Sequence, residues 1–127
     1  MTGVEHRLDL SPRPASAAEA RRFVARALDG VSADAREIGV LLTSELVTNA
    51  LLYAQGRITV RVVPGSAGGA VRVIVHDGNH QPVEPRRVGA DATSGRGLAL
   101  VEQLSTSWGV DLVEDDGKEV WFEVPRA

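Results

Sequence analysis

The chain has 127 residues, the usual length of one domain, and its 43% hydrophobic and 24% charged residues exclude wholesale disorder. The absence of cysteine excludes disulfides, thiolate zinc sites and cysteine nucleophiles, and the net charge of −3 argues against a broad attraction to nucleic acid or anionic membrane. No apolar run reaches the ~20 residues that span a bilayer, and the first residues lack a signal-peptide pattern, so we expect one cytoplasmic domain over residues 1–127.

Three elements are predicted in the first half of the chain. Alternating apolar residues predict a strand over residues 4–10. Residues 16–19 match a capping box, and the apolar residues that follow repeat at helical spacing as far as residue 28, which predicts an amphipathic helix. A longer helix is predicted over about residues 34–54. Its apolar residues form two stripes on nearly opposite sides, so we expect this helix to be covered on both sides.

Two hairpins are predicted in the second half. Residues 58–62 and 71–75 alternate around a turn, and residues 108–112 and 120–124 alternate around an Asp-Gly turn. Between the hairpins, the sequence predicts a long loop from Asp77 to residue 94 and a short helix that begins at about residue 97. Strands that pair with sequence neighbours, with helices gathered on one face, indicate a two-layer α+β sandwich.

Glu45 and Asn49 form the first candidate site. They lie one turn apart on a face of the long helix that is otherwise leucine and isoleucine. One interpretation is a solvated strip, with the helix phase slightly shifted. The other is a functional pair, because an unpaired buried carboxylate costs several kcal/mol and survives where something polar binds. A carboxylate that accepts a proton beside an amide oxygen that ligates a hard cation suits phosphate chemistry.

Two glycine-containing segments are further candidates. Asp77 and Gly78 end an apolar strand, which is typical of a turn. The carboxylate could instead accept a hydrogen bond from an exocyclic amine, and the glycine would allow close backbone approach. Residues 94–98 open the short helix with Gly95 and Gly97. They are either a hinge before a core helix or a helix N-terminus whose amides attract phosphate.

Taken in order, residues 45–50, 77–78 and 95–98 resemble the N box and the two glycine boxes of the GHKL superfamily of ATP-binding proteins. Residues 44–54 and 95–110 are most similar to the small bacterial anti-sigma regulatory serine/threonine kinases of that superfamily. The resemblance implies the histidine kinase- and Hsp90-like ATPase fold. This fold is a two-layer α/β sandwich of the Bergerat type, with a mixed, mostly antiparallel sheet covered by helices on one face.

The resemblance also implies roles for individual residues. Glu45 would be the general base, and Asn49 would hold the Mg²⁺ that bridges the ATP phosphates. Asp77 would bind the adenine amino group, and Gly78 would let the backbone approach the ring. Residues 82–94 would form a lid over the nucleotide. The other residues that the resemblance places at the nucleotide are Thr93, Ser94, Gly95, Arg96, Gly97 and Leu98.

Four features depart from the pattern of that family, and one of them is Leu52, which stands where a basic residue is common. Tyr53 stands where histidine is usual, and the segment Asp77-Gly78-Asn79 lacks the second glycine of the fuller Asp-x-Gly-x-Gly box. Glu119 stands where a threonine that can assist adenine binding is common. We therefore expect Glu119 to add a second carboxylate near the base pocket.

The predicted function is that of an ATP- and Mg²⁺-dependent, anti-sigma-like serine/threonine protein kinase that regulates transcription through a protein partner. That partner would be a sigma factor or an anti-anti-sigma-like regulator. The alternatives are a catalytically weak nucleotide-binding switch that sequesters a partner, and a stand-alone GHKL ATPase. We expect no direct contact with nucleic acid or membrane. The sequence leaves open which partner is bound, whether phosphotransfer is retained, and whether two copies form a homodimer.

Overall fold

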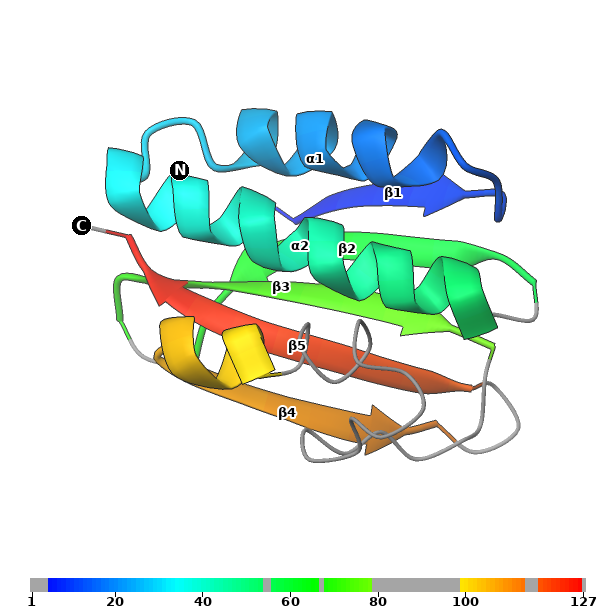
Figure 1. Ribbon diagram of the computed structural model, residues 1–127. Helices are drawn as coiled ribbons and strands as arrows, with labels where there is room; N and C mark the ends of the chain where they lie inside the picture. The colour runs from blue at the N-terminus through cyan, green and yellow to red at the C-terminus, as the bar shows by residue number, and fades with distance from the viewer. Residues whose placement is uncertain (1–4, 54–55, 67, 79–98, 114–116, 127) are drawn as a thin grey trace.

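The computed structural model describes residues 5–53, 56–66, 68–78, 99–113 and 117–126 (Figure 1). Residues 99–104 form a short helix that carries no label. The labelled elements are β1 (His6–Leu10), α1 (Ser16–Ala27), α2 (Ala33–Tyr53), β2 (Ile58–Pro64), β3 (Ala70–Asp77), β4 (Ser107–Leu112) and β5 (Lys118–Pro125).

The strands of the described residues form one sheet in the order β1-β2-β3-β5-β4, and all neighbouring strands in it are antiparallel. Helices α1 and α2 lie side by side on one face of this sheet (Figure 1). The two predicted hairpins are confirmed as β2–β3 and β4–β5, and the α+β fold class is confirmed with them. Strand β5 lies between β3 and β4, so the second strands of the two hairpins, β3 and β5, pair with each other inside the sheet.

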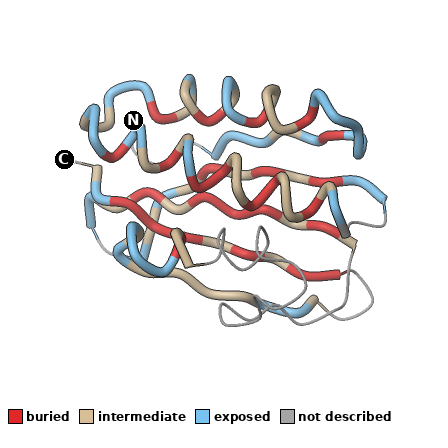
Figure 2. Tube along the Cα trace, viewed as in Figure 1, coloured by how far each residue is buried: buried red, intermediate tan, exposed pale blue. Residues whose placement is uncertain are grey.

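The core fills the space between the two helices and the sheet (Figure 2). Successive residues of a strand point to opposite faces of the sheet, which places Val60, Val73 and Phe122 in this core, and all three side chains are fully buried. The two helices approach closely where Leu28 meets Gly39 of α2. A Cβ atom at Gly39 would lie 2.5 Å from Leu28 Cδ1, so only glycine fits this contact without a shift of the leucine.

The predicted two-sided cover of α2 is wrong. Leu41 and Leu52 are 41% and 56% exposed, although both belong to an expected stripe. The two stripes instead join into one broad buried face, because Gly39, Thr43 and Ala50 between them are also buried. The side of the helix between the two apolar stripes therefore carries small or weakly polar residues that are buried as well.

The start of α1 also differs from the prediction. Ser16 is the first residue of the helix and is not its N-cap, and its buried hydroxyl donates to the carbonyl oxygen of Ser11. Glu19 forms an ion pair with Arg13. The predicted capping box is therefore absent, and these side chains hold the preceding turn against the helix. Among the described residues, no helix is both long and apolar enough to cross a membrane.

The sheet face away from the helices carries a polar network on β3 and β5. Glu123 is almost fully buried there, and it accepts hydrogen bonds from Arg72 Nε at 2.8 Å and from the Ser66 backbone N–H at 3.0 Å. Burial raises the pKa of Glu123, but these donors outweigh burial and hold the pKa below its ordinary value. The Arg72 guanidinium also lies 3.8 Å from the ring centre of Trp121, which is a cation–π contact.

Candidate functional site

The C-terminal end of α2, the end of β3 and the start of β5 lie at the same end of the molecule (Figure 1). Helix α2 contacts both of these strands. The topology therefore gathers residues far apart in the sequence around one end of the central strands. Glu45 and Asn49 come from the helix, and Asp77 and Gly78 come from the end of β3.

Glu45 and Asn49 lie on the border of the buried face of α2. Both are half-buried, whereas Leu46 and Ala50, the residues that follow each of them, are buried. The sequence predicted that this pair would lie in the middle of an apolar face, and the structure places it at the edge. An edge position suits a site, because the side chains are held by a rigid helix and still reach solvent. Each of the two side chains also interacts with other groups of the chain.

Asp77 is a buried charge whose partner is Lys118. The two residues face each other directly across β3 and β5. Asp77 Oδ1 accepts a hydrogen bond from Lys118 Nζ at 3.3 Å, and the side chains are only 5% and 6% exposed. Both lie on the helix side of the sheet, in register with Val75 and Val120 of the core. The carboxylate predicted to bind a base is therefore present at the predicted strand end, in a charge-balanced pair.

Gly117 allows the two strands to meet so closely at this point. Its φ is +82°, a conformation that favours glycine. A Cβ atom on Gly117 would overlap the carbonyl oxygen of Asp77 and would lie 2.7 Å from Gly78 Cα. Gly117 and Gly78 therefore form a contact of backbone against backbone that fixes where the Asp77 carboxylate emerges from the sheet.

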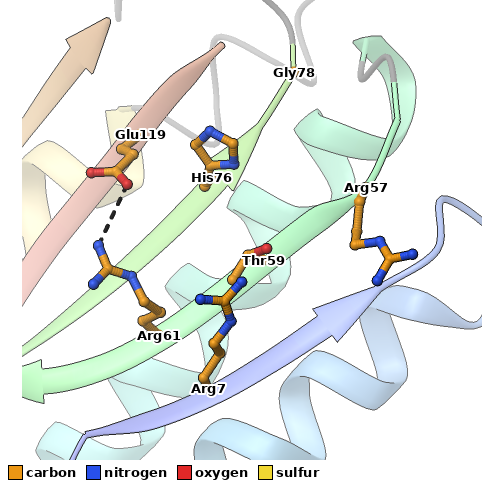
Figure 3. A pocket seen from close by; sticks show the side chains of 7 residues that line it. All are labelled: Arg7, Arg57, Thr59, Arg61, His76, Gly78 and Glu119. Atoms are coloured by element: carbon orange, nitrogen blue, oxygen red, sulfur yellow. Dashed lines mark hydrogen bonds and ion pairs between the residues drawn. The ribbon is translucent and has the colours of Figure 1, made fainter. Parts of the chain in front are cut away.

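The expectation for Glu119 is wrong. Because successive residues of a strand point to opposite faces, Lys118 lies beside Asp77 while Glu119 lies on the far face of the sheet. There Glu119 accepts a hydrogen bond from Arg61 at 3.4 Å, and it lines a hollow with His76 (Figure 3). It therefore adds no second carboxylate near Asp77.

The far face of the sheet carries this hollow, which has a volume of about 430 Å³. Its lining residues are Arg7, Arg57, Thr59, Arg61, His76, Gly78 and Glu119 (Figure 3). Much of its charge is balanced locally, since Arg7 pairs with Asp9 at 3.2 Å and Arg61 pairs with Glu119. A hydrogen bond from Thr59 and the charge of Arg7 hold the pKa of Asp9 below its ordinary value. No sequence pattern predicted this hollow, because it depends on the order of the strands in the sheet.

The remaining predicted nucleotide-binding residues lie outside the described part of the chain. These are Thr93, Ser94, Gly95, Arg96, Gly97 and Leu98. The predicted lid at residues 82–94 and Asn79 also lie outside it. The short helix that follows is described from residue 99, and Val101 anchors it in the core.

The antiparallel sheet and the one-sided helices define an α+β domain, and the polar residues at one end of the central strands form its candidate ligand site. The chain matches the family model of the histidine kinase-like ATPase domain over residues 10–124. It therefore belongs to that family. The predicted relation to the GHKL ATPases is confirmed, and ATP is the ligand that this domain implies. The narrower resemblance to anti-sigma kinases stays a prediction. No curated protein matches the chain significantly.

Proposed function

We propose that the chain is an anti-sigma-like serine/threonine protein kinase, which binds ATP with Mg²⁺ and phosphorylates a regulatory protein partner. The observation that carries the proposal is the placement of Glu45 and Asn49 one turn apart at the open edge of α2. A proton acceptor thus lies next to an amide oxygen that can ligate Mg²⁺. Both belong to the C-terminal half of α2, and this helix ends at the end of the molecule where Asp77 ends β3.

The donor and acceptor groups at this end fit a nucleotide. Burial and the ion pair with Lys118 fix the position of the Asp77 side chain. Its carboxylate can only accept hydrogen bonds, and the amino group of adenine is a group that can donate one. The described residues contain no group of three or more histidines or carboxylates that could hold a metal. Mg²⁺ that is bound with ATP keeps several waters and takes one or two protein ligands together with substrate phosphates. Asn49 would be such a ligand.

Each residue has a distinct role in this proposal. ATP supplies a transferable phosphoryl group when it is bound. Glu45 would accept the proton of the partner's serine or threonine hydroxyl and so orient its oxygen for attack. Asn49 would hold Mg²⁺, and Asp77 would orient the base. Leu41 and Leu52, which lie on the helix surface beside Glu45, offer apolar area for a docking protein.

ATP binding is tested by calorimetry on the wild type, Asp77→Asn and Asp9→Asn, with and without Mg²⁺. Loss of a charge-assisted bond to the base costs about 1.5–3 kcal/mol, so Asp77→Asn is expected to bind ATP about ten- to hundredfold more weakly. Asp9→Asn removes an exposed aspartate on the far face and is expected to bind ATP like the wild type. Equal affinity of folded Asp77→Asn would refute the assignment of the base site.

Phosphotransfer is tested with ATP labelled on its γ-phosphate, incubated with candidate regulator proteins, and by release of free phosphate. Glu45→Gln is expected to keep ATP binding and to lose about 10²–10⁴ in rate. Glu37→Gln, an exposed change on the same helix, is the matched control and is expected to retain the rate. If the wild type binds ATP and neither transfers nor hydrolyses it, the alternative of a nucleotide-binding switch replaces the kinase.

A further inference from the structure

The Asp77–Lys118 pair is the most deeply buried ion pair that the structure describes at the candidate site. Replacing a buried ion pair by apolar residues is often neutral or stabilising, so stability alone gives little reason for two buried charges at this position. The next described positions on the same face of these strands, Val75 and Val120, are apolar and buried. The pair thus combines an acceptor and a donor in an apolar environment, where hydrogen bonds discriminate strongly between ligands.

The two side chains have complementary hydrogen-bonding capacity. A carboxylate only accepts hydrogen bonds, and an ammonium group donates up to three and accepts none. Because Lys118 Nζ lies 3.3 Å from Asp77 Oδ1, the two groups present an acceptor and a donor side by side. The 6-amino edge of adenine has the opposite pattern, since the amino donor is flanked by the ring-nitrogen acceptors N1 and N7.

We propose that Lys118 is a specificity-determining residue that reads the base together with Asp77. Its ammonium group donates to a ring nitrogen next to the 6-amino group while Asp77 accepts from the amino group itself. The inference rests on the ATP binding argued above and assigns a further base contact to the same site. Gly117 supports it, because the close backbone approach holds Lys118 directly opposite Asp77. If Lys118 were only a structural counter-ion of Asp77, removing a ring nitrogen from the ligand would leave the affinity unchanged.

The test measures by calorimetry how tightly the wild-type chain binds ATP, 1-deaza-ATP, 7-deaza-ATP and 3-deaza-ATP. Each deaza analogue has a carbon in place of one ring nitrogen. One of the first two analogues is expected to bind about ten- to hundredfold more weakly than ATP, since it loses a bond from a charged donor. The 3-deaza analogue changes the ring away from the amino group and is expected to bind like ATP. Equal binding of ATP and the 1- and 7-deaza analogues would overturn the proposal and leave ATP binding intact.

Two variants identify Lys118 as the donor. In Lys118→Met, which keeps the length of the side chain, ATP and the sensitive deaza analogue are expected to bind with equal affinity. Lys118→Arg retains a charged donor and is expected to retain the preference for ATP. A preference unchanged in Lys118→Met would overturn the proposal. If Lys118→Met does not fold, equal binding of ATP and the deaza analogues by the wild type still overturns the proposal, and loss of the preference for ATP in Lys118→Arg contradicts it as well. A wild type that binds no ATP refutes the proposed function and this inference together.

Discussion

Gly117 and Gly69 form a natural matched pair for testing how the end of β3 is held. Both glycines have φ of +82°, so an alanine at either position adopts the same left-handed conformation. Around Gly69, no atom of the described residues beyond its two chain neighbours lies within 4 Å of an added Cβ. At Gly117 the added Cβ would overlap the Asp77 carbonyl oxygen and would lie 2.8 Å from the Asp77 carbonyl carbon. These neighbours are backbone atoms, which cannot rotate away as a side chain can.

The expected magnitudes follow from these contacts. The left-handed conformation costs an alanine about 1–2 kcal/mol, which is the whole expected effect of Gly69→Ala on the free energy of unfolding. Gly117→Ala bears that cost and an overpacking cost of about 1–3 kcal/mol, because β5 must move away from the end of β3. The expected loss for Gly117→Ala is therefore about 2–5 kcal/mol.

The assay is guanidinium-induced unfolding of the wild type and the two variants, followed by circular dichroism. ATP affinity is then measured on the folded variants by calorimetry. Gly117→Ala is expected to weaken ATP binding as well, since the displaced strand end carries Asp77. Gly69→Ala, at the other end of β3, is expected to leave ATP affinity unchanged. Equal losses of stability in the two variants would refute the argument that Gly117 is required by its contact with Asp77.

Three further predictions concern a buried acid, the magnesium ligand and the helix contact. Glu123→Gln is expected to lower the free energy of unfolding by about 1.5–3 kcal/mol in neutral buffer. This difference in stability should shrink as the pH falls below 4.5, the ordinary pKa of glutamate, because the lowered pKa of Glu123 stabilises the fold only while its carboxylate is charged. A difference that stays the same at every pH in urea titrations would contradict this. Asn49→Ala is expected to abolish the effect of Mg²⁺ on ATP affinity in calorimetry, and a retained effect would place the metal elsewhere. Gly39→Ala is expected to cost about 1–3 kcal/mol in guanidinium unfolding, and no loss would mean that Leu28 shifts freely.

The strands and their partners could be predicted because alternation is a local signal. Val73 and Phe122 each lie in a run with a period of two residues, and the turns between the runs fixed which strands pair as hairpins. The placement of β5 between β3 and β4 depends on packing of the whole sheet, and no local pattern of residues predicts it. The hollow on the far face escaped prediction for the same reason.

The candidate site was predicted in part. Asp77 lies at the strand end where the sequence placed it, and Glu45 and Asn49 share a helix face as their spacing required. Lys118 was missed, although a signal existed, because counting back by twos from the buried Phe122 places Lys118 and not Glu119 on the helix side. The resemblance to the family pattern had placed Glu119 near the base pocket, whereas the structure places the adjacent Lys118 beside Asp77.

The stacking of Arg72 on Trp121 gives the molecule an optical reporter. The chain has two tryptophans, and they lie on adjacent strands but on opposite faces of the sheet. Trp108 pairs with Phe122 of the core, whereas Trp121 lies over Gly109 on the far face, under the guanidinium that also binds Glu123. Intrinsic fluorescence therefore contains two signals from one hairpin. Replacing either indole by phenylalanine would isolate the emission of the other, so that the interior and the outer surface of the sheet can be followed separately during unfolding.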